Sequence, residues 1–383
     1  MAKQAYVYSG TDWVPLASEV TNLSSYQTKA LNQFPYRNLV INGAMQVAQR
    51  STSVASLTAG AYRTADRWYN NINSQGTWTQ SVENDAPTGS GFRKSLKMLC
   101  TTADASPSSG DRLYISQLFE GQNLQQIKKG TAAAEQLTVS FWVKSNVTGT
   151  YIVEFYDNDN TRQISKSYTV NASGTWEYKT ITIPADTTGA FDNDNALSFE
   201  VIFWLGTGSD LTSGTLNSSS WNSVTAANRA VGQTNLASAT NNYWQVTGVQ
   251  LEVGATATPF EFKPYAQDLA ECQRYYYRNT PGTVDGHYGL AQVRSTTQFE
   301  FTMLFPVSLR VRPTSIEYSN IGVKRAGIGV YAVSSIALAD TESGPNAAML
   351  SGTNSTSGAS AGQAISIMNN TNAAGYLAVN AEL

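Results

Sequence analysis

Residues 244–278 read WQVTGVQLEVGATATPFEFKPYAQDLAECQRYYYR, and this stretch determines how the chain divides. Its first part alternates apolar and polar residues up to a glycine, which predicts a strand that ends there. A proline then precedes a short helix, because Leu269, Cys272 and Tyr276 recur at helical spacing. The stretch therefore predicts the last strand of one β-domain, followed by a helical joint (residues 263–278) to a second domain.

Residues 38–262 contain many short strand signals separated by polar turns. The clearest strand, residues 137–144, alternates apolar and polar side chains and directs Trp142 outward. Other strands are expected at residues 39–41, 95–100, 114–119, 150–156, 164–170, 177–183, 196–205 and 244–253. So many strands with almost no helix predict an all-β, antiparallel jelly-roll sandwich.

Residues 279–383 predict a smaller C-terminal β-sandwich domain. Phe299, Phe301, Met303 and Phe305 alternate with Glu300, Thr302 and Leu304 and give one buried face. Strands are expected at residues 288–293, 298–305, 307–312, 315–318, 327–333, 364–368 and 377–381, with a loop at 341–362. Burial against sister subunits would help a domain of this size. The alternative is a monomeric sandwich with a mobile loop.

Residues 1–37 predict a separate N-terminal segment. Tyr6 and Tyr8 belong to the first arm of a small hairpin and Trp13 to the second, and a helically spaced apolar pattern then runs to Phe34. A segment this short cannot bury its aromatic side chains alone. We expect it to dock either on a partner or along the edge of the first domain.

The composition excludes several classes of protein. Charged residues make up 14% of the 383 residues and the net charge is −3, without a basic stripe, so phosphate-mediated nucleic-acid binding is not expected. No apolar leader and no window of ~18 apolar residues is visible, so we expect neither a signal peptide nor membrane insertion. The two cysteines, Cys100 and Cys272, are predicted to be buried free thiols.

The sequence offers little support for catalysis. His287 is the single histidine, which excludes a multi-histidine metal site, and no nucleophile motif accompanies it. A glycosidase needs two carboxylates roughly 5–10 Å apart. The strand carboxylates that could meet in that way are Glu154, Glu177, Glu200 and Glu252. However, no β-helix repeat of the kind found in phage depolymerases is visible. We therefore predict a protein that is not an enzyme.

Calcium is the one cofactor that the sequence raises. The run Asp-Asn-Asp-Asn occurs at residues 157–160 and again at 192–195. Neither run continues as an EF-hand loop, and Asp and Asn are ordinary turn residues. The prediction is no cofactor, with a structural Ca²⁺ as the alternative.

Aromatic side chains are the best candidates for ligand contacts. Aromatic residues make up 11% of the chain. Sugars stack their apolar faces on such rings, while amides and carboxylates bind the hydroxyls. Trp221 lies in a long Gly/Ser/Thr/Asn-rich run and is the tryptophan least expected in the core. Trp142, Tyr151 and Tyr156 complete the predicted ligand-binding set.

Four motifs, which occur in the same order along the chain, resemble the tail-fibre and receptor-binding proteins of tailed bacteriophages. The clearest is the stretch at residues 244–278, with its GVQLE strand, its PFE run and a helix that ends in CQRYY. Before it comes NLVINGAMQVAQRSTS at residues 38–53, followed by DRWY at 66–69. The others are FPVSLRVRPT at residues 305–314 and the terminal AEL. The match runs from about residue 38 to residue 383.

This resemblance implies a virion protein, made in the host cytoplasm, that binds host surface polysaccharide as a homotrimer. It implies that residues 1–37 attach to a tail adaptor or nozzle, or to a capsid protein, through Tyr6, Tyr8, Trp13 and Phe34. The first alternative is a capsid-attached head fibre or decoration protein without receptor activity. The second is a polysaccharide-degrading tailspike. The virion protein to which residues 1–37 dock, a tail adaptor or a capsid protein, would distinguish a tail fibre from the first alternative. Paired carboxylates in an aromatic cleft would favour the second alternative.

Overall fold

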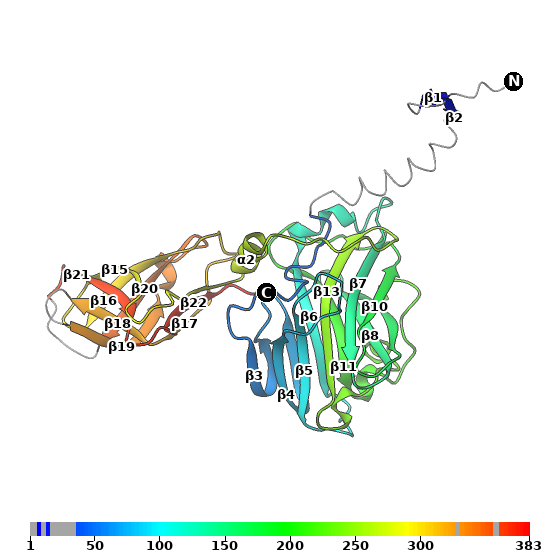
Figure 1. Cartoon of the computed structure of the whole chain (residues 1–383), viewed down its shortest axis with the longest axis horizontal. Helices are drawn as coiled ribbons and strands as arrows, with labels where there is room; N and C mark the ends of the chain where they lie inside the picture. The colour runs from blue at the N-terminus through cyan, green and yellow to red at the C-terminus, as the bar shows by residue number, and fades with distance from the viewer. Residues whose placement is uncertain (1–5, 9–12, 16–35, 326–328, 355–359) are drawn as a thin grey trace.

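A large β-sandwich and a smaller β-barrel make up the molecule, and they meet at helix α2 (Tyr265–Gln273), as Figure 1 shows. The computed structural model describes residues 6–8, 13–15, 36–325, 329–354 and 360–383. The predicted class is confirmed: the fold is all-β and antiparallel, a larger sandwich precedes a smaller β-part, and a short helix joins them. No helix in these ranges has the length and hydrophobicity needed to cross a bilayer.

One continuous sheet folds over to form both layers of the sandwich. Its order is β10-β7-β13-β5-β4-β6-β11-β8-β9-β12, and β3 pairs with β4. The long strand β4 passes from one layer to the other, because its C-terminal half pairs with β5 and its N-terminal half with β6. The strands are β3 (Ser53–Tyr62), β4 (Tyr69–Glu83), β5 (Ser95–Thr102), β6 (Arg112–Glu120), β7 (Leu137–Ser145), β8 (Gly149–Asp157), β9 (Arg162–Val170), β10 (Glu177–Ile183), β11 (Leu197–Thr207), β12 (Asn222–Ser223) and β13 (Tyr243–Val253).

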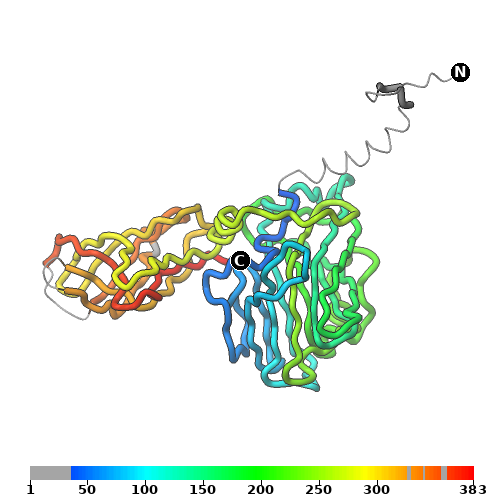
Figure 2. The backbone as a smooth tube through the Cα atoms, in the orientation of Figure 1, coloured from blue at the N-terminus to red at the C-terminus, as the bar shows by residue number. Residues whose placement is uncertain are grey.

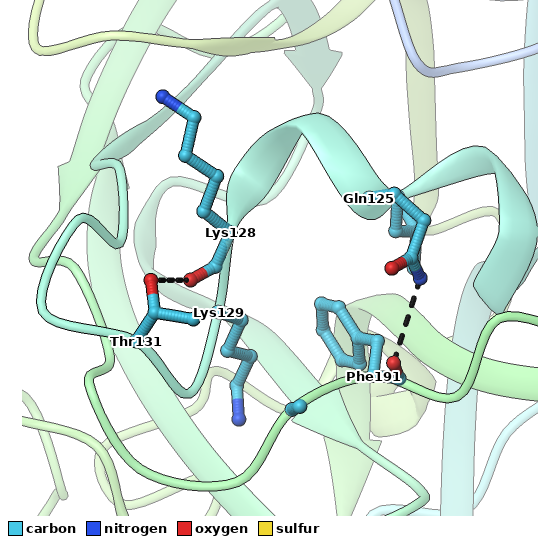
Figure 3. A pocket seen from close by; sticks show the side chains of 7 residues that line it. Gln125, Lys128, Lys129, Thr131 and Phe191 are labelled. Atoms are coloured by element: carbon cyan, nitrogen blue, oxygen red, sulfur yellow. Dashed lines mark hydrogen bonds between the residues drawn. The ribbon is translucent and has the colours of Figure 1, made fainter.

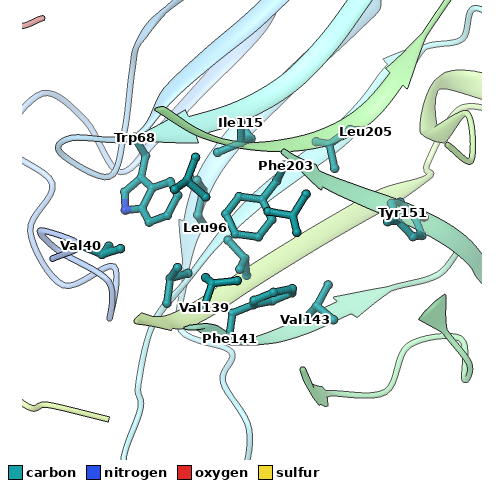
Figure 4. Packing of buried hydrophobic residues seen from close by; sticks show 14 of the residues in the cluster. Val40, Trp68, Leu96, Ile115, Val139, Phe141, Val143, Tyr151, Phe203 and Leu205 are labelled. Carbon is teal, nitrogen blue, oxygen red and sulfur yellow. The ribbon is translucent and has the colours of Figure 1, made fainter. Parts of the chain in front are cut away.

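The core of the sandwich lies between the two layers. Figure 4 shows Trp68, Phe141 and Phe203 packed together there. Phe141 and Phe203 meet edge to face with ring centroids 5.1 Å apart. Both cysteines are buried and free, as predicted, and Cys100 belongs to this core.

Two differences from the expected strands lie near the start of the sandwich. Residues 39–41 are not a strand, because the chain turns at Asn42 (φ 57°), whose side chain donates to the Val47 and Asp66 carbonyls. Strands β3 and β4 were not expected, since β3 is rich in Ala and Ser and β4 in Asn, Ser and Gln. The pairing of β3 with β4, and of β4 with β5 and β6, outweighs this weak local propensity.

The C-terminal part closes as a barrel rather than a sandwich. Its order is β15-β16-β20-β19-β18-β21, and a three-stranded sheet β14-β22-β17 links it to α2. Residues 307–312 are not a strand. Strand β20 lies in the predicted loop, and its burial alternates so that Ala348 and Leu350 fill the barrel core. The strands are β14 (Tyr276–Asn279), β15 (His287–Val293), β16 (Gln298–Leu304), β17 (Ser315–Ser319), β18 (Ile321–Arg325), β19 (Gly329–Leu338), β20 (Ala347–Asn354), β21 (Ala364–Asn369) and β22 (Tyr376–Asn380).

The predicted N-terminal hairpin is present. Strand β1 (Tyr6–Tyr8) pairs antiparallel with β2 (Trp13–Pro15). Phe34, which was assigned to attachment with the aromatic residues of this hairpin, lies outside the described residues.

Both ends of the C-terminal part return to the joint, as the tube in Figure 2 shows. Glu382 forms ion pairs with Arg67 and Arg50 of the sandwich. Arg67 also lies over the Tyr275 ring at 3.5 Å, and Arg50 over the Tyr276 ring at 3.6 Å. The tyrosines after α2 therefore pack between the two parts, and the ion pairs of Glu382 link the two parts to each other.

Candidate functional site

Trp221 lies in the core, and the expectation that it is an exposed ligand contact is wrong. Its side chain is 7% exposed, its Nε1 donates to the Pro184 carbonyl at 2.9 Å, and its ring packs near Phe199. The surrounding run is polar, but it folds against β9: Asn217 donates to the Gln163 carbonyl and Ser165 to the Arg229 carbonyl. Trp221 is therefore a core residue although the sequence around it is polar.

The other predicted ligand residues separate into three places. Tyr151 is fully buried, where its hydroxyl donates to the Val147 carbonyl at 2.9 Å and its ring stacks on Tyr168, so its assignment as a surface contact is also wrong. Trp142 faces outward on β7, as predicted, beside Tyr178 of β10. Tyr156 faces outward on β8, in the opposite layer.

The outer face of that opposite layer gathers a set of polar and aromatic side chains, which we call the tyrosine face. Strand register explains it. Asn71 of β4 lies opposite Tyr114 of β6, and Glu200 of β11 lies opposite Tyr156 of β8. Paired residues point to the same side of a sheet, and residues two apart on a strand share that side. The tyrosine face consists of Tyr69, Asn71, Tyr114, Tyr156 and Glu200, all half-buried.

Contacts fix several of these side chains. The Asn71 amide donates to the Tyr114 hydroxyl at 3.1 Å. Tyr114 meets the buried Trp204 edge to face, with ring centroids 4.9 Å apart. The Arg229 guanidinium lies 4.9 Å from the centre of the Tyr156 ring. The rings are therefore held in place before any ligand arrives, which lowers the entropic cost of binding.

Glu154 of β8 points to the same side of the sheet as Tyr156, and its carboxylate is fully occupied by partners. Arg229 donates to both of its oxygens, at 2.7 and 3.1 Å, and Trp204 Nε1 donates at 2.9 Å. The Glu154 carboxylate has no solvent exposure. It holds Arg229 and the loop that carries it, residues 208–242, against the sheet.

Glu200 is the titratable group of the tyrosine face. Burial raises the pKa of its carboxyl to about 7, and the neighbouring Glu154 adds to the rise. Within the described part of the chain, no Lys or Arg lies at ion-pair distance from it. Near neutral pH this carboxyl is therefore part protonated, and it can both donate and accept a hydrogen bond with a hydroxyl group.

Of the four strand glutamates, the fold brings only Glu154 and Glu200 to one face. Glu177 binds the backbone of residues 171–172, and Glu252 binds Thr258. A glycosidase needs a second carboxylate that is free to act as nucleophile or base. Glu154 is not free, so this pair does not form a hydrolytic site as it stands.

A second aromatic group occupies the outer face of the first layer. Tyr178 is 46% exposed and its ring lies 5.3 Å from that of Trp142. Trp176 donates to Asp85 at 3.2 Å, and the Lys144 ammonium lies 5.3 Å from the Trp176 ring. This group has fewer unpaired polar side chains beside its rings, because Lys144 and Asp85 pair with each other.

No triplet of His, Cys, Asp or Glu in the described ranges is arranged to hold a metal ion. Asp157 of the first Asp-Asn-Asp-Asn run pairs with a lysine, Lys129. In the second run, Asn195 binds the Arg310 carbonyl at the joint. His287 is exposed at the start of β15.

The sequence could not single out Tyr69, Asn71 or Tyr114. They become neighbours through the order β4-β6-β11, which joins strands that are not consecutive in the chain. The alternation of Tyr114 with the core residues of β6 was the one available signal.

Comparisons with known proteins show no family for this chain. No family model matches it, and no curated protein sequence matches it. Among solved structures it is similar to the enzymatically active domain of bacteriophage CBA120 tailspike protein 4, with 15% identity and a TM-score of 0.30, covering 57% of this chain and 22% of that one. It is also similar to TmCBM61 in complex with β-1,4-galactotriose, with 11% identity and a TM-score of 0.28, covering 57% and 99%. A family 11 carbohydrate-binding module from Clostridium thermocellum has 10% identity and a TM-score of 0.28, covering 54% and 98%. TM-scores this low establish neither a fold nor a function.

Proposed function

We propose that the β-sandwich binds a polysaccharide through the tyrosine face. The observation that carries the proposal is the meeting of three outward tyrosines, Tyr69, Tyr114 and Tyr156, with Asn71 and Glu200 on one sheet face. Rings of this kind stack on the apolar faces of sugars, and the amide and carboxyl groups bind hydroxyls.

We propose further that binding occurs without cleavage. Glu154 is fully buried and is held by Arg229 and Trp204, which supports a structural role for it. Glu200 alone does not provide the two carboxyl groups that glycoside hydrolysis uses.

The wider role that we propose is that of a homotrimeric tail fibre in a bacteriophage virion, with host surface polysaccharide as its ligand. The ordered sequence motifs support this role, and residues 1–37 are the proposed attachment to the virion. Three copies would multiply weak sugar contacts by avidity. Identification of the virion protein that residues 1–37 bind would distinguish a tail fibre from a capsid fibre.

Binding and turnover can be measured in one experiment. Purified protein is incubated with host surface polysaccharide, and both the bound fraction and the release of reducing ends are followed. Binding without new reducing ends is the expected result. Release of reducing ends would contradict the non-enzymatic role, and failure to bind would contradict the proposed ligand.

A further inference from the structure

Lys129 is a buried cation at one end of the sandwich. Its side chain is 2% exposed, and its ammonium pairs with Asp157 and with Asp186, the latter at 3.1 Å. It also donates to two successive backbone carbonyls, those of Thr188 at 3.0 Å and Gly189 at 2.7 Å. Four oxygens from β8 and the 186–189 segment thus surround one positive charge. We call these four oxygens the Lys129 cage.

Other contacts build the cage independently of Lys129. The other oxygen of Asp157, Oδ1, accepts from the Asn160 backbone at 3.0 Å and from the Asn160 amide at 3.2 Å. Arg162 donates to both oxygens of Asp186, at 2.8 and 3.0 Å. Gly189 has φ 72°, and a Cβ there would lie 2.6 Å from the Asn160 side chain, so glycine is required for the close approach. The oxygens are therefore held in place by the fold.

The oxygen set is of the kind that hard divalent cations prefer. Calcium takes carboxylate and carbonyl oxygens at about 2.3–2.6 Å, with water completing its shell. The Lys129 ammonium lies 2.7–3.1 Å from the Thr188, Gly189 and Asp186 oxygens. A shift of about 0.5 Å per oxygen would convert ammonium spacing to calcium spacing.

Water can reach the cage once the lysine side chain is absent. Lys129 lines a surface hollow of about 420 Å³ together with Lys128, Thr131 and Phe191. Figure 3 shows that the two lysines point in opposite directions, Lys129 inward and Lys128 away from it. Lys128 pairs instead with the exposed Glu135.

We propose that the Lys129 cage is a cation site which the chain fills with its own ammonium, and which binds Ca²⁺ when the Lys129 side chain is removed. The charges agree with this proposal. Asp157 and Asp186 carry two negative charges, and Lys129 and Arg162 balance them. Loss of Lys129 leaves a buried excess of negative charge, which is costly unless another cation enters.

The test compares Lys129→Ala with Lys128→Ala. In buffer with a chelator, Lys129→Ala should melt well below the wild-type protein. About 1 mM Ca²⁺ should raise its melting temperature by about 5 °C or more, because a ligand that binds only the folded state stabilises it. Potassium at equal ionic strength should not. Lys128→Ala and the wild-type protein should not respond to calcium.

A second readout reports occupancy directly. The Trp221 ring lies 5.5 Å from the Lys129 ammonium, so Tb³⁺ in the cage should show luminescence excited through tryptophan. Asp157→Asn in the Lys129→Ala background should abolish both the luminescence and the calcium response.

Four results would overturn the proposal. Lys129→Ala could fail to respond to calcium, or stay unfolded at every calcium concentration. The response could persist in the Asp157→Asn double variant. Finally, Lys129 and Asp157 could be joined covalently by an amide bond, whose nitrogen carries no charge and so cannot act as the cation of the cage. The intact wild-type chain would then weigh one water less than its sequence requires.

Discussion

Arg229 holds Glu154 by two parallel hydrogen bonds, from Nε to Oε1 at 2.7 Å and from Nη2 to Oε2 at 3.1 Å. This buried pair joins the 208–242 loop to the sheet beside the tyrosine face. Arg229→Ala should lower the free energy of unfolding by about 3–5 kcal/mol, because it leaves a buried carboxylate unpaired. Urea denaturation measures the loss.

The double variant Arg229→Ala with Glu154→Gln is the control for that prediction. It removes the unpaired charge, so it should be more stable than Arg229→Ala alone. Equal stability of the single and double variants would show that the ion pair is not what holds the loop.

Trp221 provides a test of its placement in the core. Trp221→Ala should cost about 3–5 kcal/mol of unfolding free energy, since it opens a cavity and removes a buried hydrogen bond to Pro184. Trp221→Phe should cost less. Polysaccharide binding by the folded variant should be unchanged. Normal stability with loss of binding would instead restore Trp221 as a ligand contact.

Stability should depend on the protonation of Glu200. Its folded pKa of about 7 lies above the ordinary value of 4.5, so the folded chain binds more protons between these values. The contribution of Glu200 is therefore fully present below pH 4.5 and is lost as pH rises through 7. The difference in unfolding free energy between Glu200→Gln and the wild-type protein should therefore shift in favour of the variant by on the order of 2 kcal/mol from pH 5 to pH 8. An equal difference at both pH values would contradict this.

The C-terminal glutamate should couple the two parts of the molecule. Glu382→Ala leaves the buried Arg67 without its carboxylate, which should cost about 3 kcal/mol and separate one calorimetric transition into two. Arg294→Ala is a suitable control, because its ion pair with Glu300 is exposed and should contribute less than about 1 kcal/mol. A single transition in Glu382→Ala would show that other contacts couple the parts.

The sequence was sufficient for the class of fold because most strands carry their own pattern. The alternation over β7 and β16 predicts each strand and its buried face. Strand β4 shows where this fails. Its run YNNINSQGTWTQSVE has weak local propensity, and its pairing with the three strands β3, β5 and β6 stabilises it.

The candidate site was less predictable, because exposure depends on packing between distant segments. Tyr156 and Tyr151 were both named as ligand contacts, but five residues separate them on one strand, so they point to opposite sides. Tyr156 faces outward and Tyr151 is buried. Trp221 gave no signal of burial within its polar run. Which tyrosines join Tyr156 depends on the strand order of the folded sheet.

The most direct test of glycan binding by the tyrosine face is the dissociation constant for host surface polysaccharide, measured for the wild-type protein and two variants. Tyr69→Ala removes a ring from the face, and Tyr178→Ala removes an exposed ring from the opposite layer. Both variants are first checked for an unchanged melting temperature. We predict that Tyr69→Ala weakens binding by about 5- to 10-fold, the equivalent of ~1 kcal/mol for one stacked ring, and that Tyr178→Ala leaves it unchanged. Weakening by Tyr178→Ala alone would place the ligand on the other layer and contradict the account.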